Sequence, residues 1–419
     1  MSEKLPQLKA LGDSPQQRVL WMAMFTHSLE GRRGLPYVLV GEPGTIKTSI
    51  LKHLSRMGGL PFQGILGSLM SPMDFLGVPI PQRMQLTPET QHLDPDGGSE
   101  FLHMHYAPAG FAVRAAMHKR SVMLFDEANT MPPGVQAAML RVLFEGVVGE
   151  LELPKDTRMF LAMNKQEDAA GGWDIAPALA NRMGWLEWEG TNPEKFASYL
   201  IGSGGLGSAA MPVDPINPAE LEAEVDKRWA EAWARATGEV TGFLRRKPEN
   251  FHRKPDAADA AKPWPSSRTW DYLAHALAGS YIFDLTAQER EMACSAYVGS
   301  AVYRELFTWM KDSDLPDPVE LLTGVDTFTH NPARIDRTAA VLSSCTSLVI
   351  KKDATDRIPR TTKLWEILEH LVVTSPDCTD VCLPSVVAMC RARLMLNQPK
   401  AYEVLSKVEP MMQAAGLTA

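Results

Sequence analysis

Apolar residues recur along the first third of the chain in spacings that predict alternating helices and strands. The segment QQRVLWMAMFTHSLEG, residues 16–31, has the three-to-four-residue spacing of a helix. The run LPYVLV, residues 35–40, is continuously apolar and short, which predicts a strand buried on both faces. The loop GEPGTIKTS, residues 41–49, follows this strand and leads into a second helical pattern. The order is therefore strand, loop, helix.

Two more apolar runs end in polar residues. The first, residues 122–125, is followed by Asp126 and Glu127, and the second, RMFLAMNKQ at 158–166, contains Asn164. Between them PGVQAAMLRVLFEG predicts a helix and VVGELELP an arm of a hairpin. Short apolar strands separated by helices favour an α/β fold with a parallel sheet, which binds ligands at the carboxyl ends of its strands.

The composition changes after residue 190. Residues 201–218 are rich in Gly, Pro and Ser, which is typical of a connection, and a charged helical segment follows. From Arg268 the pattern is helical to the end. We therefore expect a nucleotide-binding core at 1–190, a linker with a helical segment at 191–264, and a helical region at 265–419.

The charge and the cysteine content restrict the classes of function that this chain can have. The 419 residues carry a formal net charge of −8, so no global field attracts nucleic acid or an anionic membrane. The basic run RRKPENFHRK, residues 245–254, is a local exception that is more typical of solvated surface. The beginning of the sequence lacks the apolar centre of a secretion signal, and no apolar run is long enough to span a membrane. The five cysteines are too few and too clustered for a disulfide framework and fit a reducing cytoplasm.

Two groups of potential metal ligands are interpreted as structural. Cys378 and Cys382 lie four residues apart, but no pair of His or Cys at zinc-finger spacing accompanies them. They are predicted to be ordinary reduced cysteines. His103 and His105 alternate as residues of a strand do and have no evident third ligand.

The loop at 41–49 matches the phosphate-binding pattern G-x-x-x-x-G-K-[ST] at Gly41, Lys47 and Thr48. Ile46 occupies the position of the second glycine. A residue at the beginning of a helix can adopt a helical φ, so we expect Ile46 to be tolerated if its side chain points away from the phosphates. The lysine would reach the β and γ phosphates, and the hydroxyl would bind Mg²⁺.

The acids Asp126 and Glu127 complete a nucleotide site if they lie at the tip of a buried strand. Asp126 can hold Mg²⁺ there, and Glu127 can activate the attacking water as a general base. The alternative is that one acid caps the next helix. Asn164 can orient water or contact the γ-phosphate, and either Arg182 or Arg268 can stabilise charge on the transferred phosphoryl group.

In this order, the motifs resemble those of the AAA+ ATPases, and within them the MoxR-like group. The resembling segments are GEPGTIKTS as Walker A, VMLFDEAN as Walker B, FLAMN as sensor 1, PALANR as the arginine-finger segment and SSRTWDYL as sensor 2. Residues 74–82 and 104–111 resemble the insertion that this group carries before Walker B, and FEGVVGELELP resembles its hairpin before sensor 1. The likeness covers about 15–190, and 265–310 more loosely; it assigns nothing to 311–419.

The resemblance implies a cytoplasmic ATPase whose hexameric ring holds ATP and Mg²⁺ between subunits and remodels a protein client with a von Willebrand factor A domain partner. Thr48 and Asp126 would bind the metal, Glu127, Asn164, Arg182 and Arg268 would be catalytic, and Arg268 would couple a helical lid to the site. The nucleotide-binding residues would be Gly41, Glu42, Pro43, Gly44, Thr45, Ile46, Lys47, Thr48 and Ser49.

Two other hypotheses stay open at this point. A nucleic-acid motor of restriction or translocase type can use the same core, although the acidic balance makes nucleic acid an unlikely partner. A nucleotide-gated scaffold that does not hydrolyse ATP would explain Ile46, but it would need neither Glu127 nor Arg182.

Overall fold

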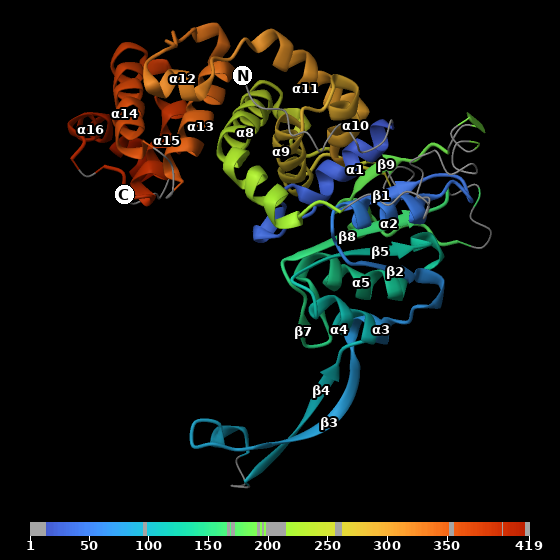
Figure 1. The fold of residues 1–419 in the computed structure, drawn as a ribbon. Coiled ribbons are helices and arrows are strands. Elements are labelled where there is room, and N and C mark those ends of the chain that lie inside the picture. The colour runs from blue at the N-terminus through green and yellow to red at the C-terminus, as the bar shows by residue number, and fades with distance from the viewer. Residues whose placement is uncertain are drawn as a thin grey trace. The chain divides into compact units, whose positions relative to one another are not determined.

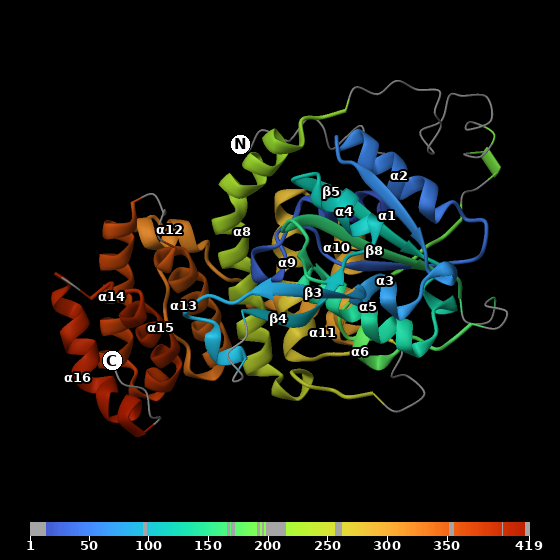
Figure 2. The ribbon, with the colours of Figure 1, turned by 90° about the horizontal axis from the view of Figure 1, so that it is seen from below.

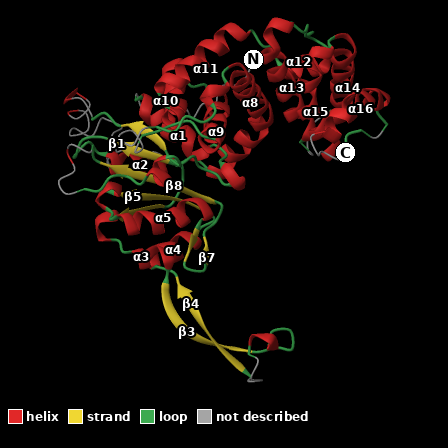
Figure 3. Ribbon diagram, turned by 180° about the vertical axis from the view of Figure 1, so that it is seen from behind, coloured by secondary structure: helices red, strands yellow, loops and turns green. Residues whose placement is uncertain are grey.

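The structure is a computed structural model that describes residues 14–94, 99–165, 168, 172–190, 193–194, 197, 215–255, 262–351, 356–395 and 397–414. The chain divides into two compact units, Met1–Pro218 with Asp256–Pro263, and Ala219–Pro255 with Trp264–Ala419. Figure 1 labels their elements. The first unit contains the sheets, and the described part of the second consists of helices and loops, as the colours of Figure 3 show.

Five strands form the main sheet of the first unit in the order β2–β5–β8–β1–β9, and all neighbouring pairs are parallel. Their bounds are β1 (Tyr37–Val40), β2 (Phe62–Leu66), β5 (Arg120–Asp126), β8 (Asp156–Met163) and β9 (Gly184–Glu187). After β1 the chain passes to the far edge of the sheet, returns strand by strand to β8, and then crosses to the other side of β1. A ligand crevice is expected at this reversal, outside the carboxyl ends of β1 and its neighbours.

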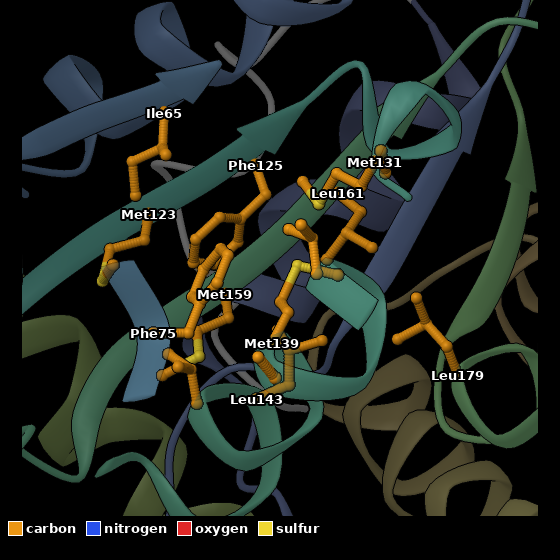
Figure 4. Packing of buried hydrophobic residues seen from close by; sticks show 14 of the residues in the cluster. Ile65, Phe75, Met123, Phe125, Met131, Met139, Leu143, Met159, Leu161 and Leu179 are labelled. Atoms are coloured by element: carbon orange, nitrogen blue, oxygen red, sulfur yellow. The ribbon is translucent and has the colours of Figure 1, made fainter. Parts of the chain in front are cut away.

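Alternate residues of each strand face opposite sides of the sheet. One face packs against α3 (Pro72–Leu76), α4 (Gly110–Ala116) and α5 (Pro133–Glu145). Figure 4 shows this core, in which the rings of Phe75 and Phe125 have centroids 5.8 Å apart. Burying one such side chain stabilises the fold by about 1.5–3 kcal/mol. The helices α1 (Pro15–Phe25) and α2 (Lys47–Met57) cover the other face (Figures 1 and 3).

Two small antiparallel sheets accompany the main one. The strands β3 (Val78–Gln85) and β4 (Glu100–Ala107) form a ribbon that extends away from the α/β core (Figure 1), and β6 (Val147–Val148) and β7 (Leu151–Glu152) form a tight hairpin. Glu150, in that hairpin, accepts hydrogen bonds from the Tyr106 backbone at 3.0 Å and lies 2.7 Å from His105 Nδ1. The hairpin therefore anchors the base of the ribbon.

The second unit is built from helices that share a core. Leu364, Trp365 and Leu368 lie in this core, so one face of the helical segment 358–373 packs inside the unit, whereas Ile358 and Val373 are exposed. In Figure 2 the later helices gather into one bundle. The α-helices are α8 (Pro218–Arg246), α9 (Ser267–Ile282), α10 (Ala287–Val298), α11 (Ser300–Ser313), α12 (Pro318–Thr323), α13 (Ile335–Ile350), α14 (Arg357–Thr374), α15 (Thr379–Arg391) and α16 (Pro399–Ala414).

The expected fold class is confirmed: a parallel sheet flanked by helices is followed by a mainly helical region. The strands and the hairpin predicted from apolar runs are present, whereas β2 and β9 were not predicted because their sequences are short and mixed. Residues 201–214 of the predicted connection at 201–218 lie outside the described residues. The domain boundaries at 190 and 264 stay predictions. In the part of the chain that the structure describes, no helix has the length and apolarity needed to cross a membrane.

Candidate nucleotide-binding site

The loop between β1 and α2 lies at the carboxyl end of the sheet. A Cβ on Gly41 would come within 2.4 Å of the Trp188 carbonyl oxygen, so glycine is required there. Gly44 has φ +75°, which favours glycine for conformational reasons. Trp188, just after β9, donates its indole N–H to the Thr45 carbonyl at 2.8 Å and holds the loop from outside.

Ile46 does not adopt the helical φ that the sequence analysis expected. It has φ 58° and ψ 21°, in the left-handed region, immediately before the first residue of α2. A β-branched residue is a clear outlier there, and the left-handed conformation costs about 1–2 kcal/mol. The expectation was wrong because the chain turns sharply from the loop into the helix, and this turn needs a positive φ at position 46.

Lys47 is buried and turned back onto the loop. Its ammonium donates hydrogen bonds to the carbonyls of Gly41 at 2.9 Å and Glu42 at 2.8 Å, and to Asn164 Oδ1 at 3.1 Å. Burial lowers the pKa of Lys47, and the carboxylates of Asp126 and Asp168 act in the opposite direction. All three donors are thus used, and a phosphate would have to replace some of these acceptors.

The side chains of Thr48 and Asp126 are in contact at the carboxyl ends of the strands, where the ligand crevice is expected. The Thr48 hydroxyl, in the first turn of α2, donates to the Asp126 carboxylate at the end of β5. A hydroxyl and a carboxylate oxygen in contact with each other are the oxygen ligands that Mg²⁺ prefers. These two residues fit the expected metal site.

Glu127 follows Asp126 in a left-handed conformation, with φ 57° and ψ 42°. Its backbone N–H donates to Asp126 Oδ1 at 2.9 Å, and its carbonyl accepts from the Thr130 hydroxyl at 2.7 Å. Glu127 occupies the N-cap position of the short helix Ala128–Thr130, but its side chain makes no capping hydrogen bond, and the N-cap of α5 is Pro132. In the described part of the chain no hydrogen bond occupies the half-buried Glu127 carboxylate, which can therefore bind water.

Asn164 lies directly after β8, next to β1 in the sheet. Its side-chain oxygen accepts from Lys47, and its carbonyl accepts from Asn129 Nδ2 at 3.0 Å. Asn129 is 5% exposed, and no described group binds its side-chain oxygen. The sequence analysis did not single out Asn129 or Trp188. Asn129 could have been noticed from its place in FDEANT, whereas nothing in the sequence indicates that Trp188 reaches the loop.

Arg182 lies at the other end of the sheet. It comes two residues before β9, and β9 is parallel to β1 with Gly184 opposite Tyr37, so Arg182 is at the amino edge. The guanidinium stacks on the Phe144 ring, 4.6 Å from its centroid, near the carboxyl end of α5. Phe144 is roughly 16 Å along α5 from the end that is next to Asp126, since a helix rises about 1.5 Å per residue. Arg182 and the phosphate loop of one chain are therefore on opposite edges.

Arg268 belongs to the second unit. It lies in the first turn of α9 and is exposed, and the preceding Ser266 forms a capping box with Thr269. Four of the predicted site residues thus form two pairs in side-chain contact, Lys47 with Asn164 and Thr48 with Asp126. Glu127 is adjacent to Asp126 and donates its backbone N–H to the Asp126 carboxylate.

Comparisons with known proteins add little to this description. No protein-family model and no curated protein matches the sequence. One similar solved structure is the crystal structure of an inferred ATPase from Cytophaga hutchinsonii, with 16% sequence identity and a TM-score of 0.46. The similarity covers 73% of this chain and 91% of that chain.

Proposed function

We propose that this chain is a Mg²⁺-dependent ATPase of the AAA+ type that acts as a ring oligomer. The observation that carries the proposal is the convergence of Lys47, Thr48, Asp126 and Asn164 at the carboxyl ends of β1, β5 and β8. Lys47 would bind the β and γ phosphates, and Thr48 and Asp126 would hold Mg²⁺, which neutralises charge on these phosphates. The backbone N–H groups at the beginning of α2 add positive potential.

Glu127 would be the general base. As the oxygen of a water molecule bonds to the γ-phosphorus, the bond from that phosphorus to the bridging oxygen breaks, and the products are ADP and phosphate. The Glu127 carboxylate accepts the proton that the water loses. Asn164 would position this water or the γ-phosphate with its amide group, and Lys47 keeps Asn164 in place.

The position of Arg182 supports a ring. At the amino edge of the sheet it is too far to stabilise charge at its own loop, but it can do so at the loop of a neighbouring subunit. Repeated head-to-tail contacts with this geometry close into a ring, and a hexamer is the AAA+ form. Arg268, exposed in the first turn of α9, would link the helical region to the γ-phosphate as a lid residue.

The surface of the β3–β4 ribbon favours a protein client over nucleic acid. The ribbon exposes Val78, Ile80 and Leu102 by 55%, 47% and 64%, and Arg83 is the only Lys or Arg in its two strands. Two cations of the basic run 245–254 also have acidic neighbours, since Arg245 pairs with Asp380 and Lys247 lies 3.7 Å from Glu249. We therefore favour a cytoplasmic MoxR-like remodelling ATPase, with a von Willebrand factor A domain partner, over a DNA or RNA motor.

The test is Mg²⁺-dependent ATP turnover combined with measurement of particle mass. We expect turnover by the wild type and loss of both binding and turnover in Lys47→Ala. Glu127→Gln should bind ATP and hydrolyse it about 10²–10⁴-fold more slowly. Lys52→Ala, an exposed lysine on the same helix, is the matched control and should behave like the wild type.

Two results would contradict the proposal in different ways. ATP binding without turnover in the wild type, with and without client proteins, would establish the scaffold alternative. Strong stimulation of turnover by DNA or RNA that declines with added salt would establish the nucleic-acid motor.

A further inference from the structure

The helical unit brings together three side chains with metal-binding atoms. His330 lies before the short helix Pro332–Arg334, and Asp377 and Cys378 end the short helix Pro376–Cys378 that leads into α15. One ligand atom of each residue lies within 4.8 Å of the other two. His330 Nε2 is 3.3 Å from Asp377 Oδ2. The sequence analysis found no partner for Cys378 because His330 is 48 residues away along the chain.

The imidazole of His330 is held in one orientation. Its Nδ1 lies 2.8 Å from the hydroxyl of Thr338 in α13, and only 5% of the side chain is exposed. When Nδ1–H donates to this hydroxyl, Nε2 keeps its lone pair and directs it at the Asp377 carboxylate. A histidine fixed by a hydrogen bond at its second nitrogen is the arrangement found at metal ligands. In this tautomer Nε2 and the Asp377 carboxylate are two acceptors 3.3 Å apart, and a metal ion bound between them would satisfy both.

Cys378 supplies the third ligand. The thiol is buried and lies 3.1 Å from the Ser375 carbonyl, and burial raises its pKa. A neutral thiol binds metals weakly, so binding would release the Cys378 proton to solvent as the sulfur–metal bond forms. The N-terminus of α15, where Cys378 is the N-cap residue, supplies partial positive charge that favours the resulting thiolate.

We propose that His330, Asp377 and Cys378 form a site for a divalent transition metal, with Zn²⁺ as the best match. One nitrogen, one carboxylate oxygen and one thiolate suit tetrahedral Zn²⁺ and do not suit Mg²⁺ or Ca²⁺, which take oxygen ligands. Water would supply the fourth ligand, since the Asp377 side chain is 47% exposed. The metal would join the segment before α13 to the beginning of α15 and stabilise the helical unit. This site is distinct from the proposed Mg²⁺ site at Thr48 and Asp126.

The first experiment titrates Co²⁺ into the full-length, nucleotide-free and metal-depleted protein. We expect one Co²⁺ per chain with a sulfur-to-cobalt charge-transfer band in the near ultraviolet, and complete loss of this band when one equivalent of Zn²⁺ is added. Zn²⁺ should also raise the unfolding temperature. A wild-type protein that shows no charge-transfer band, or that binds Co²⁺ without it, would overturn the proposal.

Variants identify the ligands. Cys378→Ser should lose the band and the thermal stabilisation by Zn²⁺. Asp377→Asn, a change at an exposed residue that leaves the fold intact, should bind Zn²⁺ about 10-fold or more weakly. Cys390→Ser, a change at a half-buried cysteine in the same helix, is the matched control and should bind as the wild type does. Wild-type affinity for Zn²⁺ in folded Cys378→Ser would overturn the proposal, because the metal would then bind without the thiolate.

Discussion

The ammonium of Lys47 donates a 3.1 Å hydrogen bond to Oδ1 of Asn164, a residue 117 positions further along the chain. The two side chains meet because β1 and β8 are adjacent and parallel, with Val40 opposite Met163, so both strands end at the same edge. The lysine, which would bind phosphate, and the amide, which would sense it, are therefore already connected. Nucleotide binding would replace some of the three acceptors of Lys47 by phosphate oxygens.

Replacing Asn164 by Ala tests the role of this contact. The change removes the amide that would act on the γ-phosphate or the water but leaves Lys47 its two backbone acceptors. We expect turnover to fall about 10²-fold or more while ATP still binds. Steady-state turnover and calorimetric titration with ATP measure the two quantities. Lys165→Ala, a change at the exposed neighbouring residue, is the control. Equal turnover in Asn164→Ala and the wild type would exclude a catalytic role for this amide.

Asp126→Asn tests the metal site. The amide keeps the shape of the carboxylate but removes its charge, so we expect the Mg²⁺ concentration for half-maximal turnover to rise about 10-fold or more. A titration of turnover with Mg²⁺ at saturating ATP gives this value. Asp156→Asn, at the amino edge of the sheet, should leave the Mg²⁺ dependence unchanged. The same Mg²⁺ dependence in both variants would remove Asp126 from the proposed metal site.

Mixing variants tests whether Arg182 acts in a neighbouring subunit. Arg182→Ala and Glu127→Gln should each be inactive alone, because each lacks one essential group. A mixed ring places an intact Glu127 opposite an intact Arg182 at some interfaces, so mixing should restore part of the turnover. Arg141→Ala, which removes an exposed arginine on α5, should keep full activity. No recovery on mixing, despite formation of mixed oligomers, would contradict action across the interface.

Substitutions at Ile46 test the strain in the loop. Both Ile46→Gly and Ile46→Ala remove the branched side chain, but only glycine adopts φ 58° without a steric penalty. The free energy of unfolding should be about 1 kcal/mol higher for Ile46→Gly than for Ile46→Ala. Denaturant unfolding of the two variants measures the difference. A more stable alanine variant would show that the left-handed conformation is not retained in solution. We also expect Ile46→Gly to bind ATP at least as tightly as the wild type.

The sequence by itself determined the three buried strands predicted at 35–40, 122–125 and 158–166, because a parallel strand covered on both faces is apolar along most of its length. It also placed Lys47, Asp126 and Asn164 after such strands, and residues at the ends of adjacent parallel strands necessarily lie on one edge. The ribbon strands and the backbone angles of Ile46 could not be predicted from apolar runs. Backbone angles in a tight loop depend on the positions of the elements on either side of it.

Only the tertiary structure decided the order of the strands, and with it the location of Arg182 at the amino edge, opposite the phosphate loop. Strand order results from contacts between residues far apart in the sequence, which local periodicity does not encode. The same reason applies to His330 and Cys378. They become neighbours because α13 and α15 pack together, and a search for metal ligands at short spacing cannot find such a pair.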